Sequence, residues 1–195
     1  MFKKKALTKL IAASIAAGIL SFTSMISPAN DFNDVPILQT SVAHAKSAED
    51  HYNLGNKYYK SGNYRQAIVE YTEAIRLTQP GCYIDAYFCR GFAYHKLKNY
   101  DAAIKDYTKV IESTKGFLGI PTMNRLSCEA YYNRAGAYAV SGNLEAALKD
   151  FTKVIELQPD KGKAYYLRGL IYKAMGDNTK AQADYAKARE LGYNG

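Results

Sequence analysis

The residues best suited to catalysis or metal binding are few in this chain, and their spacing does not form a site. His44, His51 and His95 could act as general bases or bind zinc, but none stands at metal-ligand spacing from another histidine or a cysteine. The sequence contains no glycine-rich phosphate loop, no nucleophile elbow and no paired catalytic carboxylates. We therefore expect a protein that is not an enzyme, with no catalytic residues, no metal site and no cofactor.

The composition is that of a folded protein with a moderate positive charge. Of 195 residues, 48% are hydrophobic, which is enough for a packed core. The net charge is +8, but four of the lysines lie within the first nine residues, so a chain starting at Asn30 would carry +4. Basic and acidic residues alternate along the remaining chain, which does not favour binding to nucleic acid.

Residues 1–29 are typical of a secretory signal peptide. A basic start precedes an apolar run from Leu10 to Phe22, and small residues follow. Cleavage is expected after Ala29, with Ala45 as the alternative site, so residues 30–47 form a linker. The run is short for a membrane span, although an uncleaved signal anchor remains the alternative. We expect an extracytoplasmic bacterial protein, periplasmic or secreted, that meets a membrane only if the leader is retained.

Three cysteines would follow such a leader into an oxidising compartment. They are Cys82, Cys89 and Cys128, and an odd number leaves at least one thiol unpaired. Cys82 and Cys128 both stand near the start of a predicted helix, so a bridge between them is one alternative. The other is three free thiols, because a disulfide needs Cα atoms within about 7 Å.

The chain from residue 48 onward consists of four similar segments, 48–80, 84–113, 128–160 and 162–195. Counted from the first residue of each segment, the same residue types return at the same positions. Position 11 is always tyrosine, position 20 is always alanine, and position 24 is always aromatic. These residues are Tyr58, Tyr94, Tyr138 and Tyr172; Ala67, Ala103, Ala147 and Ala181; and Tyr71, Tyr107, Phe151 and Tyr185.

This pattern resembles the tetratricopeptide repeat (TPR), a helix-turn-helix unit of about 34 residues with small residues at positions 8, 20 and 27. The resemblance covers residues 48–195 and implies an all-α, right-handed α-solenoid of eight helices. Each repeat would contribute a helix A and a helix B. Apolar residues at three- and four-residue steps agree with amphipathic helices.

The turns and the last repeat add two expectations. Three helix A-to-B turns contain glycine, whereas the second has Lys98 and Asn99, one of which would need a positive φ. In helix B of the last repeat, Gln182 and Arg189 stand where the earlier repeats have isoleucine or leucine. Polar residues there would end the array without leaving an exposed apolar surface.

Position 7 and position 23 form a second regularity, an arginine with an acidic residue. The pairs are Arg90 with Asp106, Arg134 with Asp150 and Arg168 with Asp184, while the first repeat has Leu54 and Glu70. Because an arginine near a helix seam needs an acceptor, we interpret these pairs as structural.

The TPR resemblance also implies a concave groove, lined by helices A, that holds extended or helical peptides. The residues of this chain at the corresponding positions are Tyr52, Asn56, Tyr59, Phe88, Phe92, His95, Tyr132 and Tyr166. An aromatic ladder rimmed by lysine would suit a peptide with apolar side chains. The alternative is that these rings pack between layers. The lysine and asparagine set with which chaperone-type TPR domains bind a carboxyl terminus is absent, since Tyr52 and Cys89 occupy two of its positions.

About ten extra residues separate the second and third repeats, and Gly116, Gly119 and Pro121 predict an insertion loop over 114–127. The sequence thus predicts a protein-interaction scaffold that binds a peptide or partner protein through its groove and has no small-molecule substrate. The alternative is an accessory or adaptor subunit of an envelope assembly or secretion machine that uses the convex face or this loop. The sequence does not identify the partner.

Overall fold

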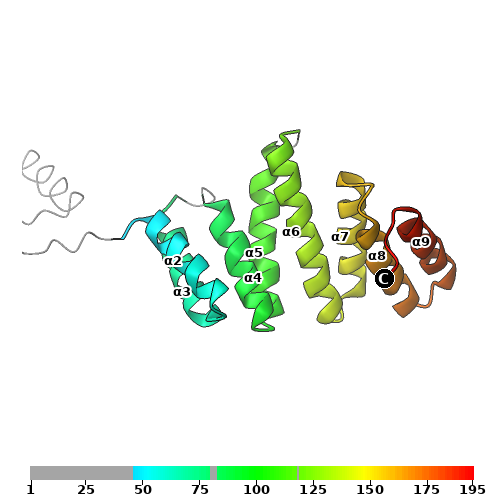
Figure 1. Cartoon of the computed structure of the whole chain (residues 1–195), viewed down its shortest axis with the longest axis horizontal. Coiled ribbons are helices and arrows are strands. Elements are labelled where there is room, and N and C mark those ends of the chain that lie inside the picture. Colours follow the sequence, from blue (N-terminus) through cyan, green and yellow to red (C-terminus); the bar gives the residue numbers. More distant parts are fainter. Residues whose placement is uncertain (1–45, 80–82, 118) are drawn as a thin grey trace, which may run out of the picture. The chain divides into compact units, whose positions relative to one another are not determined.

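The computed structural model describes residues 46–79, 83–117 and 119–195, which belong to one compact unit (Figure 1). Over these residues the chain forms eight α-helices and one short 3₁₀ helix, and no strand. The predicted signal peptide and most of the predicted linker lie outside the described residues. The elements are α2 (Ala48–Lys60), α3 (Tyr64–Arg76), α4 (Ile84–Lys96), α5 (Tyr100–Thr114), η1 (Lys115–Phe117), α6 (Pro121–Val140), α7 (Leu144–Leu157), α8 (Gly162–Ala174) and α9 (Asn178–Glu190).

The helices pack as four pairs, one pair in each repeat. Helices α2 and α3, α4 and α5, α6 and α7, and α8 and α9 form the pairs, and α3 packs on α4, α5 on α6 and α7 on α8. Each helix therefore contacts chiefly its sequence neighbours, as in a solenoid (Figure 1). The predicted all-α repeat solenoid is confirmed.

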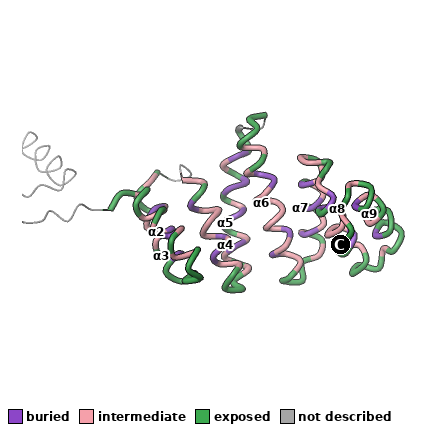
Figure 2. The backbone as a smooth tube through the Cα atoms, in the orientation of Figure 1, coloured by how far each residue is buried: buried purple, intermediate pink, exposed green. Residues whose placement is uncertain are grey.

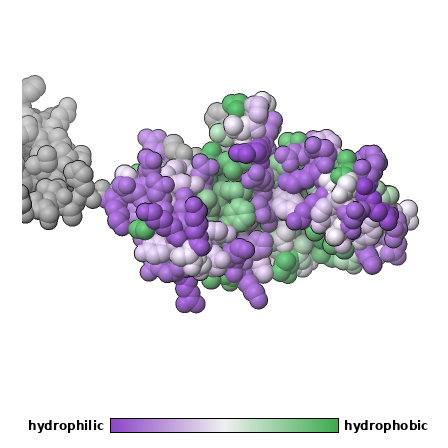
Figure 3. Space-filling view, viewed as in Figure 1, coloured by the Kyte–Doolittle hydropathy of each residue, from purple (hydrophilic) through white to green (hydrophobic). Residues whose placement is uncertain are grey.

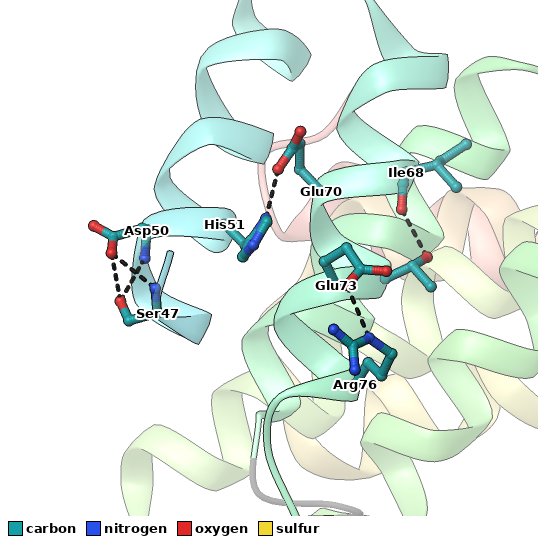
Figure 4. A network of polar contacts seen from close by, with 8 residues as sticks. Ser47, Asp50, His51, Ile68, Glu70, Glu73 and Arg76 are labelled. Carbon is teal, nitrogen blue, oxygen red and sulfur yellow. Dashed lines mark hydrogen bonds and ion pairs between the residues drawn. The ribbon is translucent and has the colours of Figure 1, made fainter. Parts of the chain in front are cut away.

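Side-chain caps start the second helix of every repeat. Asn63, Asn99 and Asn143 accept a hydrogen bond from the backbone N–H three residues on, and Asp177 does the same for α9. Helix α2 begins with a capping box in which Ser47 and Asp50 satisfy each other's backbone N–H groups (Figure 4). The local sequence thus fixes where these five helices begin, whereas α4, α6 and α8 have no side-chain cap.

The core of each repeat is a large ring packed against small residues. Burial is concentrated on the facing sides of the helices (Figure 2). Tyr71 and Tyr107 are buried at position 24, and each crosses the partner helix at a glycine. A Cβ on Gly55 would lie 2.6 Å from Tyr71 Cε1, and one on Gly91 would lie 2.9 Å from Tyr107 Cε1. The small residue at position 8 therefore permits close helix approach.

The turn without glycine adopts the backbone that the sequence predicted. Lys98 has φ 59°, whereas Gly62, Gly142 and Gly176 take positive φ in the other three turns. Lys98 N–H donates to the His95 carbonyl, and Asn99 N–H donates to that of Tyr94, which closes the turn. A lysine thus occupies a conformation that favours glycine.

The predicted arginine–aspartate pairs are confirmed. Arg134 binds Asp150 through two nitrogens, at 2.7 and 2.8 Å, and the same fork joins Arg90 to Asp106 and Arg168 to Asp184. The third contact of each arginine reaches helix B of the preceding repeat. Arg134 Nη1 donates to Thr108 Oγ1 at 2.8 Å, and Thr72 and Thr152 accept the equivalent bonds. Each arginine therefore joins two repeats.

In the first repeat position 7 is Leu54, so Glu70 at position 23 pairs with His51 at position 4 instead. His51 Nδ1 lies 2.7 Å from Glu70 Oε2, joining α2 to α3 (Figure 4). Both side chains are largely buried. His51 therefore serves as a polar link within the first helix pair.

The prediction of a loop over 114–127 is wrong for most of its length. Helix α5 runs to Thr114, η1 follows, and α6 begins at Pro121 and continues to Val140. Proline is well suited to the first turn of a helix, because its fixed φ is helical and its missing N–H would be unpaired there. Ser127 is buried in this extension, and the α5–α6 pair rises above its neighbours in Figure 1.

The last helix B presents the surface that was expected. Gln182 and Arg189 are exposed, while Ile111, which occupies the position of Arg189 in the second repeat, is buried. The array therefore ends in a polar face.

Two remaining predictions concern the cysteines and the membrane. Cys82 lies outside the described residues, so the predicted bridge to Cys128 stays a prediction. Cys128 is buried, with Sγ 4.0 Å from the Val154 carbonyl oxygen. Among the residues that the structure describes, no helix has the length and apolar character needed to span a bilayer.

Candidate functional site

The eight residues predicted to line the groove all lie on helices A. Each of them is half-buried, so each has part of its surface in contact with solvent. They are Tyr52, Asn56 and Tyr59 on α2, Phe88, Phe92 and His95 on α4, Tyr132 on α6 and Tyr166 on α8. The structure divides them into three groups.

The aromatic ladder at position 5 packs on the rings at position 24 of the same repeat. The ring centroids lie 5.9 Å apart for Tyr52 and Tyr71, 6.0 Å for Phe88 and Tyr107, 5.8 Å for Tyr132 and Phe151, and 5.5 Å for Tyr166 and Tyr185. These are tilted or edge-to-face contacts of the kind that stabilise aromatic pairs. The four ladder residues therefore take part in packing within each repeat.

Three of the ladder rings are also covered by residues outside the repeat helices. Tyr83 lies 5.2 Å from the ring of Tyr52, Tyr193 lies 5.3 Å from the ring of Tyr166, and Lys161 Nζ is 4.7 Å from the centroid of Tyr132. The segments that follow α3, α7 and α9 thus reduce the surface that these three rings offer to a ligand.

A second group, Asn56, Tyr59 and Phe92, lines one pocket between α2 and α4. The pocket has a volume of about 250 Å³, and Tyr71 and Cys89 complete its lining. Sequence reasoning missed these last two residues. The sequence identified Tyr71 only as a repeated aromatic residue at position 24, and Cys89 only as a thiol and as a departure from the chaperone-type set. Cys89 occupies a position that faces the ligand in chaperone-type repeats. That correspondence could have identified Cys89 as a groove residue.

The pocket is polar at one edge but uncharged. Tyr71 donates a hydrogen bond of 2.8 Å to Asn56 Oδ1, and the Tyr52 hydroxyl lies 3.6 Å from Cys89 Sγ. Burial raises the pKa of the Cys89 thiol, so it remains protonated and is a poor nucleophile at neutral pH. Because none of the five lining residues carries a charge, the pocket suits an apolar or neutral side chain.

The last predicted residue, His95, lies outside this pocket. Its ring packs edge-to-face on Tyr100, with centroids 5.3 Å apart. Burial lowers the pKa of His95, and Lys96 lowers it further. His95 is therefore a neutral ring at physiological pH. It packs on Tyr100 at the carboxyl-terminal end of α4 and does not belong to a cluster of titratable groups.

Other hollows and exposed apolar side chains lie elsewhere on the molecule. Two hollows of about 540 and 560 Å³ have charged linings that include the Arg90–Asp106 and Arg134–Asp150 pairs. Apolar side chains reach the surface over α4 to α6, whereas hydrophilic ones dominate over α2 and α3 (Figure 3). Val140 and Ile120, both on or next to α6, have 62% and 46% of their surface exposed.

The described residues contain no group of three or more His, Cys, Asp or Glu side chains arranged to hold a metal ion. The buried acidic side chains Asp106, Asp150 and Asp184 are each held by an arginine. The described residues thus form a helical-repeat fold with exposed apolar side chains on its surface and one uncharged pocket between α2 and α4.

Models of the TPR family match most of the repeat array. A model described as TPR repeat matches residues 55–98, and models described as tetratricopeptide repeat match residues 84–116, 128–161 and 151–183. The chain belongs to the tetratricopeptide-repeat family.

Several solved structures resemble the chain as well. A crystal structure of MamA is 25% identical, covers 76% of this chain and 80% of its own, and superposes with a TM-score of 0.66. MamA from Desulfovibrio magneticus RS-1, at 21% identity, covers 74% of this chain and 75% of its own with a TM-score of 0.65, and shows the fold alone. The first TPR domain of Spaghetti (RPAP3), bound to the HSP90 peptide SRMEEVD, is 30% identical, covers 68% of this chain and 98% of its own, and has a TM-score of 0.56. No curated protein sequence matches the chain.

Proposed function

We propose that this chain is a non-enzymatic scaffold that binds a peptide segment of a partner protein on the face formed by helices A. The observation that carries the proposal is the pocket in which Asn56, Tyr59 and Phe92, three residues expected to face a ligand, come together. TPR domains bind peptide or protein partners, and the Spaghetti domain does so with an HSP90 peptide. No cofactor and no small-molecule substrate is part of this proposal.

The pocket sets the chemistry of the bound residue. An engineered apolar cavity of about 150 Å³ holds benzene, so about 250 Å³ accommodates one large apolar or aromatic side chain. A charged side chain would lose its hydration there without gaining a partner. Exposed Lys60 and Lys96 near the ends of α2 and α4 suit an acidic residue elsewhere on the same peptide.

Selection from a phage-displayed random-peptide library tests this function. Peptides that bind the full-length chain are synthesised, and their affinities are measured by isothermal titration calorimetry. Tyr59→Ala and Phe92→Ser should weaken binding at least tenfold, because they remove two walls of the pocket. Lys105→Ala and Lys149→Ala, at exposed positions on helices B, are the controls and should leave the affinity unchanged.

Circular dichroism of each variant shows whether the helices are intact. If no peptide is enriched, or if the peptides bind the pocket variants and the wild type equally, the helix A face is not a peptide site.

We propose in addition that the scaffold works outside the cytoplasm. The support is the sequence of residues 1–29, with its basic start and its apolar run. Amino-terminal sequencing of the protein recovered from a bacterial envelope fraction is the test. A start at Asn30 or Lys46 supports export and selects the cleavage site, and a start at Met1 in a cytoplasmic fraction contradicts it.

The α5–α6 projection supports the adaptor alternative. Ile120 is 46% exposed immediately before α6, at the end of a helix pair that extends past its neighbours (Figure 1). If the chain docks through this projection, Ile120→Ser should abolish capture of a partner while Phe92→Ser should not. The opposite result assigns binding to the pocket.

A further inference from the structure

Among the described residues, one hydroxyl group near the pocket has no hydrogen-bond partner. In the first repeat, the position-24 tyrosine, Tyr71, donates to Asn56 at position 9. In the second repeat the same positions hold Tyr107 and Phe92, and a phenyl ring cannot accept this bond in the same way. Tyr107 is fully buried, and its hydroxyl is unpaired within the part of the chain that the structure describes.

Packing does not require this hydroxyl. Phe151 occupies position 24 of the third repeat and is buried to the same degree, so a phenylalanine fits a repeat of this kind. A buried hydroxyl without a partner loses its hydrogen bonds to water and lowers stability. A hydroxyl kept at such a position is therefore a candidate for contact with a molecule that the structure does not contain.

The surroundings of Tyr107 connect it to the pocket. Its ring crosses α4 at Gly91, just as the ring of Tyr71 crosses α2 at Gly55 and reaches the pocket lining. The ring of Phe92, a lining residue, lies edge-to-face on it with centroids 6.0 Å apart. Burial raises the pKa of Tyr107, and Tyr59, Asp106 and Cys89 raise it further. Two of those neighbours, Tyr59 and Cys89, line the pocket.

We propose that the Tyr107 hydroxyl donates a hydrogen bond to the bound peptide, which reaches it when the ring of Phe92 turns aside. Phe92 is half-exposed on the surface of α4, where a change of side-chain rotamer is a local motion. Tyr107 then acts as a specificity residue of the pocket. This proposal rests on the peptide-binding function proposed above.

The site determines the class of group that is recognised. The hydroxyl is protonated at physiological pH, because the ordinary tyrosine pKa of 10.0 already lies well above it and burial raises the pKa of Tyr107 further, so it offers a donor. The pocket lining contains no lysine or arginine to offset the desolvation of a carboxylate. The ligand group is therefore a neutral acceptor, such as a backbone carbonyl or a side-chain amide, next to an apolar side chain.

The test is Tyr107→Phe, with Tyr185→Phe as the matched control at position 24 of the last repeat. Urea unfolding of Tyr107→Phe should show stability equal to or above that of the wild type, because an unpaired buried hydroxyl is removed. Its affinity for the synthetic pocket-binding peptides should fall about tenfold, the effect of one lost hydrogen bond from a buried site. Tyr185→Phe should change neither quantity. Equal affinity of Tyr107→Phe and wild type overturns the proposal.

A spectroscopic measurement detects the bond directly. Peptides labelled with ¹³C at one backbone carbonyl at a time are bound to the wild type and to Tyr107→Phe, and their infrared carbonyl bands are compared. One label should absorb at lower frequency in the wild-type complex, and the shift should disappear in the variant. If no backbone label shifts, the same comparison with labelled asparagine and glutamine amides follows, and no shift there overturns the proposal.

The outcomes separate this proposal from the proposed function. If Tyr59→Ala and Phe92→Ser weaken binding but Tyr107→Phe does not, the pocket is the peptide site and the role of Tyr107 is wrong. If none of the three variants affects binding, or if no peptide is enriched, both proposals fail.

Discussion

At the scale of single residues, the second repeat departs from the other three at its turn. Lys98 has φ 59°, in the left-handed region where an L-residue other than glycine, asparagine or aspartate is uncommon. The turn still closes, because Lys98 and Asn99 both donate backbone hydrogen bonds into the end of α4. The array therefore tolerates this strain because the flanking helices hold the turn in place.

We predict that Lys98→Gly stabilises the protein. Glycine adopts positive φ at no steric cost, and Lys98 is exposed, so the change removes backbone strain and little packing. The expected gain is about 1 kcal/mol in the free energy of unfolding, measured by urea titration. Gly142→Lys, at φ 87° in the third repeat, is the reverse change and should destabilise by a similar amount. A loss of stability in Lys98→Gly would contradict the assignment of strain.

Residue types also explain which parts of the candidate site the sequence could predict. Positions along a repeat identify the helix A residues that share a face, and the structure places Asn56, Tyr59 and Phe92 together. The sequence does not distinguish a ring that faces a ligand from one that packs on the next helix, because both are half-buried aromatic residues at helical spacing. Tyr52 and Tyr132 turned out to pack on position 24, and neighbouring segments cover them.

At the scale of elements, each repeat is joined to the one before it by an arginine. Arg134 on α6 binds Asp150 on α7 and Thr108 on α5, and it lies 5.4 Å from the ring centroid of Tyr131. Only 14% of the Arg134 side chain and 4% of the Asp150 side chain are exposed. Removal of one partner leaves an uncompensated charge in a largely dry site.

We predict that Asp150→Ala lowers the free energy of unfolding by about 3–5 kcal/mol, the range seen when one member of a buried ion pair is removed. Thr108→Val removes only the contact between repeats and should cost about 1 kcal/mol. The double variant Arg134→Met, Asp150→Leu should recover most of the loss, because neither charge remains. Thermal unfolding followed by circular dichroism compares the three. A double variant as unstable as Asp150→Ala would show that the pair is needed for more than charge compensation.

Helix α9 differs from the other helices B in having a charged cap. Asp177 accepts from the Lys180 N–H and pairs with Lys180 Nζ at 2.8 Å, and these hydrogen bonds lower the pKa of Asp177 below its ordinary value of 3.8. A carboxyl whose pKa is lower in the folded state contributes stability above pH 3.8, which is lost as the pH falls through the folded-state pKa.

We predict that Asp177→Asn removes this part of the acid sensitivity. Asparagine caps α3, α5 and α7 in the same geometry, so the helix start should be preserved. Urea unfolding at pH 7 and at a series of values below pH 4 should show a smaller loss of stability for Asp177→Asn than for the wild type. If the free energies of unfolding of the two proteins fall in parallel as the pH is lowered, the pKa of Asp177 does not differ between the folded and unfolded states.

The element that the sequence predicted least well is the start of the third repeat. Gly116, Gly119 and Pro121 were interpreted together as a loop, although proline begins helices as readily as it ends them. The residues after Pro121 contain no glycine until Gly136, and this was a sign of a continuous helix. The other helices were predictable because four copies of one pattern fix the register of each pair.

At the scale of the whole molecule, a solenoid grows by adding equivalent layers, so the exposed end of the last layer controls whether growth stops. The face of α9 presents Gln182 and Arg189, both exposed. The equivalent residues of the inner repeats are Ile68, Ile104 and Leu148 at the first position and Ile75, Ile111 and Ile155 at the second, and all of them are at least half-buried. The last helix B therefore differs from the helices B of the three preceding repeats on the side where the next repeat would pack.

We predict that the double variant Gln182→Ile, Arg189→Ile associates with itself, because it recreates an inner layer without a repeat to cover it. The new apolar side chains would stand beside Tyr166 and Tyr185, which already line a hollow with both substituted residues. Sedimentation velocity over a range of protein concentrations should show a mass that rises with concentration, whereas the wild type should show no such rise attributable to this face. Lys105→Ile, Lys149→Ile places two isoleucines on exposed positions of inner helices and serves as the control. If the control associates as strongly as Gln182→Ile, Arg189→Ile, added hydrophobicity alone is the cause. If Gln182→Ile, Arg189→Ile behaves as the wild type does, polarity at these two positions is not what ends the array.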